Sequence, residues 1–141
     1  VIVLYSFDYI GHYDNQNEYY LMVVMFLGGM MGLIMAGNLL YLYLFWEITA
    51  IACWRLIGFF REKHQVLRAD KAFLITVFGA VVMLLGFIQI FNESGTLDLV
   101  NLREGLAGRP LSNLAVGLVL FGILSKSATL TSLKPLKPLT E

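Results

Sequence analysis

The chain has few of the residues from which catalytic and metal centres are built. Its 141 residues include one cysteine, two histidines and three prolines. The cysteine, Cys53, cannot form an internal disulfide and falls in an apolar run, which favours a small buried side chain. His12 and His64 both lie in polar stretches, where they cannot ligate a haem between helices. The motifs GxSxG, GxxxxGKS/T and HExxH are absent. We therefore expect no cofactor, no metal site and no catalytic residue in this chain.

Charge is also scarce. Charged residues make up 14% of the chain and hydrophobic residues 58%, with a formal net charge of zero and a mean hydropathy of +0.73. Soluble domains are about 25% charged and about 45–50% apolar. The neutral charge balance gives no reason to expect a nucleic-acid partner. The composition predicts an all-α integral membrane protein that contacts the lipid bilayer.

The apolar runs predict about four transmembrane helices. They place spans at about 19–36, 39–60, 72–91 and 113–130, in a membrane domain of residues 19–133. Residues 1–18 mix aromatic and acidic side chains, which is typical of an interfacial segment and equally of a loop following an upstream domain. The tail, 134–141, contains Pro135 and Pro138 and cannot continue a helix.

Two local features predict how the spans are arranged. Gly28, Gly29 and Gly32 form a small-residue patch, in which Gly28 and Gly32 have the GxxxG spacing of closely packed membrane helices. The short turn at Gly37 and Asn38 makes the first two spans antiparallel neighbours. The polar loop 61–71 has four lysines and arginines, whereas 92–112 has two. The positive-inside rule therefore places the first of these loops in the cytoplasm and the second outside.

The second span, Leu39 to Phe60, contains a carboxylate about 12 Å from its start, that of Glu47. A charge at that depth costs at least about 2.5–3.5 kcal/mol, so it needs a partner or a function. Lys126, inside the last apolar run, is the candidate partner. The two residues could form an ion pair that fixes helix register, or a couple that handles protons. Burial favours the neutral forms of both groups and proximity favours the charged forms, so separating or joining the pair could release or load a proton.

Four further polar residues lie near this predicted pair. Thr49, Ser125 and Ser127 could support hydration. Arg55 is about 80° around the helix from Glu47 and about 12 Å along it, so direct pairing is not expected. Arg55 is instead predicted to extend its side chain to the membrane interface. It is also a candidate supporting residue of the pair.

The stretch LLYLYLFWEITAIACWRLIGFF resembles the fifth transmembrane helix of the antiporter-like membrane subunits. These comprise the A subunits of Mrp-type cation/proton antiporters, the largest proton-pumping subunit of respiratory complex I, and relatives in membrane-bound hydrogenases. YSFDYIGHYDNQNEYY resembles the loop before the family's fourth helix, KAFLITVFGAVVMLLGF its sixth helix and LFGILSKSA its seventh. The Trp46-Glu47 pair and the Lys126-Ser127-Ala128 triplet are the most specific matches.

The sixth-helix pattern places the chain nearest the branch of the Mrp A subunits. Complex I subunits of this type usually have an arginine and an aspartate there, whereas this chain has Val77 and Ala80. The resemblance implies that Glu47 and Lys126 are the family's proton-transferring couple. It also implies that their helices belong to an inverted-repeat bundle in which a broken helix carries the lysine.

The chain departs from the family after Ala128, where a proline, a histidine and a Trp-Leu-Pro motif usually follow and TLTSLKPLKPLTE stands instead. Arg55 also replaces a usual apolar residue. We therefore expect a fragment, a truncated accessory subunit or a segment of a longer subunit.

The resemblance implies a multi-pass subunit of the cell inner (cytoplasmic) membrane that works with other membrane subunits and translocates H⁺, with Na⁺ as a candidate exchanged ion. Three alternatives stay open: a non-conducting structural subunit, the proton-pumping module of an NADH-quinone oxidoreductase or hydrogenase, and a relative linked to inorganic carbon uptake. Enzyme chemistry, if any, then belongs to partner chains.

Overall fold

The computed structural model describes Ser6, Ile10 and residues 15–60, 63–106, 108 and 110–127. The predictions for most of the interfacial segment 1–18 and for the tail 134–141 lie outside these residues. The described helices are α2 (Gln16–Met35), α3 (Leu39–Ile57), α4 (Lys63–Ser94), α5 (Leu102–Gly105) and α6 (Asn113–Lys126). The predicted all-α membrane fold is confirmed.

Three of these helices are long and apolar enough to cross a membrane. They are α2, α3 and the Val66–Ser94 part of α4, while α6 is apolar but has 14 residues. Only 6% of the α2 window and 11% of the α3 window are buried within the chain. Their apolar outer faces are therefore left for lipid or for neighbouring protein segments.

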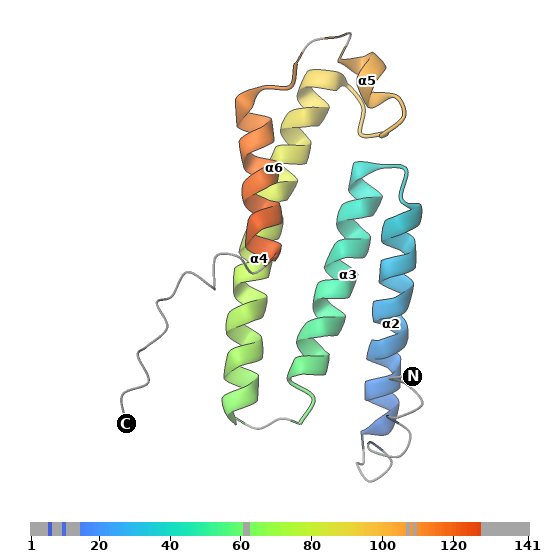
Figure 1. The fold of residues 1–141 in the computed structure, drawn as a ribbon, viewed down its shortest axis with the longest axis vertical. Helices are drawn as coiled ribbons and strands as arrows, with labels where there is room; N and C mark the ends of the chain where they lie inside the picture. The colour runs from blue at the N-terminus through green and yellow to red at the C-terminus, as the bar shows by residue number, and fades with distance from the viewer. Residues whose placement is uncertain are drawn as a thin grey trace, which may run out of the picture.

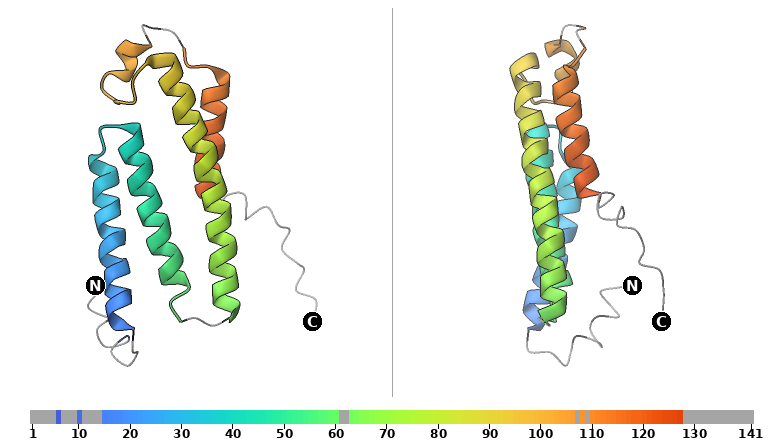
Figure 2. Two further views of the ribbon diagram at one scale, coloured as in Figure 1. Left: turned by 180° about the vertical axis from the view of Figure 1, so that it is seen from behind. Right: turned by 90° about the vertical axis from the view of Figure 1, so that its left-hand side faces the viewer.

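The helices form one layer with a fourth element set against it. Figure 1 shows α2, α3 and α4 side by side, each antiparallel to the next in the chain. The right-hand view of Figure 2 shows that α6 stands out of this layer, on one face of α4. The closest packing is between α4 and α6 and between α2 and α3, whereas α3 and α4 contact each other less.

Glycines set the close approach of α2 to α3. A Cβ atom on Gly29 would lie 2.7 Å from the Thr49 methyl group, and one on Gly32 would meet the Phe45 ring. At Gly28 no atom lies within 4 Å. Of the predicted patch, Gly29 and Gly32 therefore form the seam at i, i+3, whereas the prediction is wrong for Gly28, which is not in contact with α3.

Small residues also bring α6 against α4. A Cβ atom on Gly79 would lie 2.5 Å from Ser125, and one on Gly122 would lie 2.7 Å from the Gly79 carbonyl oxygen. Ser125 is 1% exposed, and its hydroxyl donates to the Ile75 carbonyl at 3.1 Å. This seam fixes the height at which α6 lies along α4.

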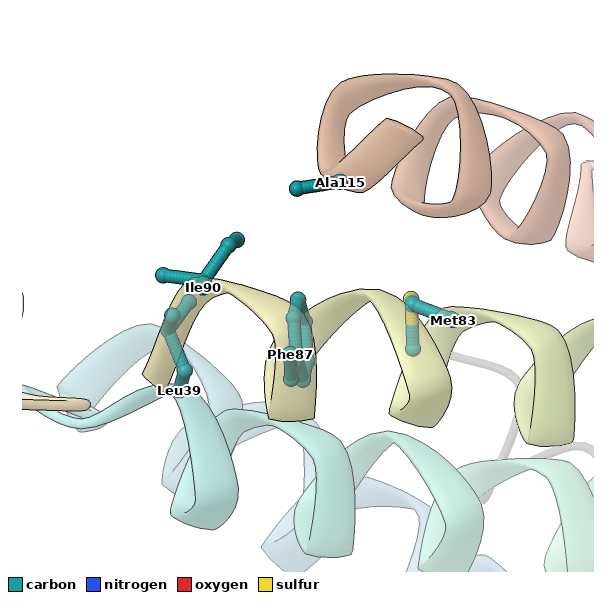
Figure 3. Close-up of a cluster of buried hydrophobic side chains, with 5 residues drawn as sticks. All are labelled: Leu39, Met83, Phe87, Ile90 and Ala115. Carbon is teal, nitrogen blue, oxygen red and sulfur yellow. The ribbon is translucent and has the colours of Figure 1, made fainter. Parts of the chain in front are cut away.

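The apolar core lies at one end of the bundle, towards the α2–α3 turn (Figure 3). Met83, Phe87 and Ile90 share one face of α4 at spacings of four and three residues. They pack with Leu39 at the start of α3 and Ala115 at the start of α6. The cluster therefore joins α3, α4 and α6 at this end.

Polar contacts hold the connections at the same end. Asn38 and Asp98 form an isolated antiparallel bridge, which ties the α2–α3 turn to the segment after α4. The Ser112 hydroxyl caps α6 by accepting from the Ala115 amide at 3.2 Å. Glu93 accepts from the Ser112 amide at 3.0 Å. These bonds satisfy helix-end groups that have no partner within a helix.

Two helices differ from the predicted boundaries. Most of the predicted loop 61–71 is helical, because α4 begins at Lys63. Its first turns contain Lys, Gln, Leu, Arg and Ala, which are good helix formers whether or not they are apolar. In contrast, α6 ends at Lys126, short of residue 130.

Candidate functional site

Glu47 and Lys126 meet inside the bundle. Glu47 is about 12 Å from the start of α3 and about 15 Å from its end, at 1.5 Å of rise per residue. Lys126 reaches the same level because α6 descends along α4 and stops about halfway (Figure 1). The Lys126 Nζ donates to the Glu47 Oε1, and the two groups form an ion pair. The predicted partners are thus in direct contact.

The amine is the more enclosed member of the pair. The Lys126 side chain is 4% exposed and that of Glu47 is 22% exposed. The Nζ atom also lies 5.1 Å from the centre of the Trp46 ring and 5.8 Å from that of Tyr43. Both distances are within the range of cation–π attraction, which is stronger where water is excluded. A carboxylate and two aromatic faces therefore hold the ammonium.

The end of α6 adds a further favourable field. Lys126 occupies its last turn, and Ser127 is the C-cap residue. The carbonyl groups of a helix C-terminus carry partial negative charge, which stabilises a nearby cation. The Ser127 hydroxyl donates to the Leu124 carbonyl at 3.0 Å, which satisfies one of these end groups. The termination of α6 therefore places the amine in a favourable electrostatic position within the bundle.

The other two predicted supporting hydroxyls bond to backbone. Thr49 is 6% exposed and donates to the Trp46 carbonyl at 2.7 Å, close to Glu47 in the chain. Ser125 faces α4 instead of the ion pair. Each hydroxyl still has lone pairs that can accept, but only Thr49 lines the cavity that contains Lys126.

Arg55 is not part of this group. It forms an ion pair with Glu18 in the first turn of α2, and its guanidinium lies 5.7 Å from the Trp54 ring centre. The expectation that it does not pair with Glu47 agrees with this geometry. The sequence pattern does not predict its actual partner, because it places Glu18 in the interfacial segment before the first span.

A cavity next to the ion pair is the main feature that the sequence does not reveal. It has a volume of about 210 Å³ and lies between α3 and α4, with Lys126 at one end. Trp54 also borders it and donates from Nε1 to the Asp70 Oδ1 at 2.8 Å. Nothing in the sequence pattern marks Asp70, which lies in a stretch of mixed charge.

The site contains no obvious metal centre. In the described part of the chain, no three His, Cys, Asp or Glu side chains are grouped so as to hold a metal ion. The Glu47 carboxylate and the Lys126 amine are both groups that can exchange a proton.

Comparisons with known proteins identify the chain's relatives. The chain is 36% identical over 132 residues to the A1 subunits of the Na⁺/H⁺ antiporters of Staphylococcus saprophyticus and Staphylococcus haemolyticus. It is 36% identical over 133 residues to the A subunit of the Na⁺/H⁺ antiporter of Alkalihalophilus pseudofirmus. Each match covers 91% of this chain and 16% of the relative, so the chain spans about a sixth of their length.

The matched family covers the bundle from the α2–α3 turn onwards. The family described as "NADH:quinone oxidoreductase/Mrp antiporter, TM" matches residues 36–132, which include both Glu47 and Lys126. This range contains α3, α4, α5 and α6. The chain is therefore a multi-pass membrane protein segment that belongs to the NADH:quinone oxidoreductase/Mrp antiporter transmembrane family.

Proposed function

We propose that this chain is part of the membrane subunit of an Mrp-type Na⁺/H⁺ antiporter, and that Glu47 and Lys126 transfer protons within it. The similarity to three Na⁺/H⁺ antiporter proteins of the A type supports the assignment. The proposal places the protein in the bacterial inner membrane, in a complex with other membrane subunits. The ions it handles are H⁺ and Na⁺.

The observation that carries the proposal is the ion pair at the middle of the bundle. Two charged groups at this depth are costly, and ionisable residues within membrane spans usually have functional roles. A purely structural pair is a weak source of stability, because desolvation offsets much of the attraction between the charges. The position of the pair beside a cavity favours a role in proton transfer.

The geometry suggests how the pair would work. In the closed arrangement Glu47, Trp46 and Tyr43 stabilise the charged ammonium of Lys126. If Glu47 moves away, the enclosed ammonium loses its counter-charge and is driven to release its proton. When the pair closes again, the charged form is favoured and the amine takes up a proton. Each cycle therefore moves one proton through the amine.

The test is proton flux into proteoliposomes that hold the assembled complex, comparing wild type with Glu47→Gln. Subunit stoichiometry is measured on the same sample. We expect intact assembly with flux lost, because glutamine keeps the shape of glutamate but cannot exchange a proton or balance the ammonium. Glu104→Gln, the same change at an exposed position on α5, is the matched control and should keep its flux.

Two outcomes contradict the proposal. Unchanged flux in an intact Glu47→Gln complex would leave the pair as a structural feature of a non-conducting subunit. Disassembly would require the milder Glu47→Asp change, which keeps the carboxylate and shortens its reach. Flux in an assembled Glu47→Asp complex that equals that of an assembled Lys126→Gln complex and of wild type would likewise contradict the proposal, because the amine would then be dispensable.

A redox-driven proton pump is the second candidate, since the family description includes NADH:quinone oxidoreductases. The same Glu47–Lys126 chemistry would then be coupled to electron transfer in partner chains. Purification in mild detergent distinguishes the two, because a redox pump brings flavin- or iron–sulfur-containing subunits with it. The antiporter interpretation predicts a complex without such subunits.

A further inference from the structure

We propose that the outer face of α4 binds an anionic phospholipid. Arg68 and Lys71 hold the headgroup phosphate, and an apolar outer stripe on the same helix contacts the acyl chains. The outer stripe consists of Leu74, Phe78, Val81 and Leu85. The site is separate from the Glu47–Lys126 pair, so the inference goes beyond the proposed function and holds whether or not the pair transfers protons.

Positive charge on α4 is concentrated where the helix begins. All its lysines and arginines lie in the first nine residues, as Lys63, Arg68 and Lys71, and all three side chains are exposed. None of them forms an ion pair within the described part of the chain. The N-terminus of a helix carries partial positive charge, so cations there do not stabilise the helix itself. An anionic ligand would compensate this cluster.

The acidic residues of α4 do not provide the compensation. They are Asp70 and Glu93. The Asp70 carboxylate accepts a hydrogen bond from the Trp54 Nε1 at 2.8 Å, which directs it towards α3. Glu93 lies 22 positions after Lys71, about 33 Å further along the helix. The cations on the outer face are therefore left without an acidic partner on their own helix.

Arg68 and Lys71 are placed to hold one phosphate together. They are three positions apart, so their side chains are neighbours on the helix surface, with about 5–6 Å between the Cβ atoms. Side chains of a helix tilt towards its N-terminus, so both cations extend towards the α3–α4 loop and away from the apolar part of α4. The apolar sequence starts at residue 72, so Lys71 lies where the hydrocarbon of the bilayer meets the headgroups. Such cations bind phosphate through charge-assisted hydrogen bonds.

The outer stripe continues from this pair into the apolar part of the helix. Leu74 is 67% exposed, Phe78 is 62% exposed and Leu85 is 51% exposed. All three lie within about 60° of Lys71 around the helix. Leu74 and Leu85 are about 16 Å apart along the axis, close to half of the hydrocarbon thickness of about 30 Å. An acyl chain of one leaflet therefore matches the stripe in length.

This face points away from the rest of the bundle. Phe73, which stacks on Trp54 of α3, is about 160° around the helix from Lys71. Ala80, which is 1% exposed, is about 180° away. Figure 1 shows α4 at the edge of the helix layer, with α3 on one side of it.

The combination of charge and apolar surface favours a lipid as the occupant. A protein segment on this face would need an acidic group for the two cations as well as an apolar surface for the stripe. An anionic phospholipid supplies both in one molecule, with its phosphate above its acyl chains. Basic residues at a membrane surface attract anionic lipids by about fivefold each. The site should therefore select phosphatidylglycerol, which has a net negative charge, over phosphatidylcholine, which has none.

The test is photocrosslinking in proteoliposomes that hold the assembled complex. The vesicles are phosphatidylcholine with a small fraction of phosphatidylglycerol that has a diazirine in one acyl chain, and a parallel sample has the diazirine on phosphatidylcholine. Light converts the diazirine into a carbene that inserts into adjacent side chains, and peptide mass spectrometry locates the labelled positions. We expect the anionic probe to label residues 74–85 at least about tenfold more than the neutral probe.

Variants at the two cations test the headgroup contact. Arg68→Gln and Lys71→Gln should each lower labelling by the anionic probe about fivefold, whereas Lys71→Arg, which keeps the charge, should retain most of it. Labelling by the neutral probe should not change. Arg103→Gln is the matched control, because it removes the same charge from an exposed position on α5, at the other end of the bundle (Figure 1). It should leave the labelling of α4 unchanged.

Competition in the wild-type complex identifies the source of the phosphate. Unlabelled phosphatidylglycerol should displace the anionic probe, whereas phosphatidylcholine and inorganic phosphate should not, because neither combines a net negative charge with acyl chains. High salt should lower the selectivity, since exposed charges are screened. Displacement by inorganic phosphate would assign the site to a soluble anion and overturn the lipid proposal.

The remaining outcomes also decide the question. Equal labelling by the two probes, or labelling that Arg68→Gln and Lys71→Gln leave unchanged, would mean that α4 contacts bulk lipid without a specific site. An absence of α4 labelling with either probe would mean that another protein segment covers this face. Each of these results overturns the proposal. If a variant fails to assemble, the comparison of the two probes on the wild-type complex still tests it.

Discussion

The Glu47 carboxylate accepts a hydrogen bond from the Lys126 amine although 79 positions separate them in the chain. The contact joins α3 to α6, two helices that otherwise touch little. We therefore expect the pair to affect stability as well as function. Glu47→Gln and Lys126→Gln should each destabilise the complex by up to about 3–5 kcal/mol, because each leaves one charge without its partner.

The double variant Glu47→Gln/Lys126→Gln should be more stable than the sum of the single changes predicts, since no uncompensated charge remains. A coupling energy of about 0.5–3 kcal/mol is typical for residues in contact. Thermal unfolding of the purified complex measures this coupling. Simple additivity of the two changes would mean that the pair does not interact in the membrane.

The α2–α3 seam predicts a contrast between neighbouring glycines. Gly29→Ala and Gly32→Ala should each cost about 1–3 kcal/mol, because the added methyl group meets Thr49 or Phe45 and forces the helices apart. Gly28→Ala, on the open side of the same helix, is the control. It should be neutral or stabilising in thermal unfolding, since alanine is the better helix former. Equal effects at all three positions would contradict this seam.

The α4–α6 seam predicts a functional effect at a distance. Gly122→Ala should displace α6, because its methyl group would lie 2.7 Å from the Gly79 carbonyl oxygen. Lys126 follows one turn later, so we expect a stability loss of about 1–3 kcal/mol together with reduced proton flux. Gly117→Ala, with no atom within 4 Å, is the control on the same helix. Thermal unfolding and proteoliposome flux measure the two effects.

The ion pair between Arg55 and Glu18 should contribute little to stability. The side chains are 36% and 27% exposed, and ion pairs of this kind contribute about 0–1 kcal/mol. Arg55→Gln and Glu18→Gln should therefore each shift thermal stability slightly. The double variant should behave like either single one, because both remove the same contact. A loss of several kcal/mol in either single variant would show that the pair is shielded from water in the complex.

The sequence allows the prediction of the ion pair because a charge in an apolar run needs a partner, and Lys126 is the candidate in another apolar run. It also allows the exclusion of an Arg55–Glu47 pair, since helical geometry separates them by angle and rise. The first prediction rests on the energetic cost of an unpaired charge, and the second rests on distances within one helix. Neither constraint requires knowledge of how the helices pack.

Other features depend on packing and could not be predicted in this way. No glycine or proline in the sequence marks the end of α6 at Lys126, where Ser127 is the C-cap residue. The choice of Gly29 over Gly28 depends on the rotation of α2 against α3. The cavity lies between α3 and α4, where Trp54 and Phe73 line it and stack on each other, a contact between positions far apart in the chain.

The depth of the ion pair also has an electrical consequence. Glu47 lies about 12 Å from the start of α3 and about 15 Å from its end, so the pair is near the middle of the voltage drop across the membrane. Moving one elementary charge across the whole membrane is worth about 2.3 kcal/mol per 100 mV. Under the proposed function, a proton that moves between the pair and either membrane face would therefore cross about half of the voltage, and both steps would depend on it.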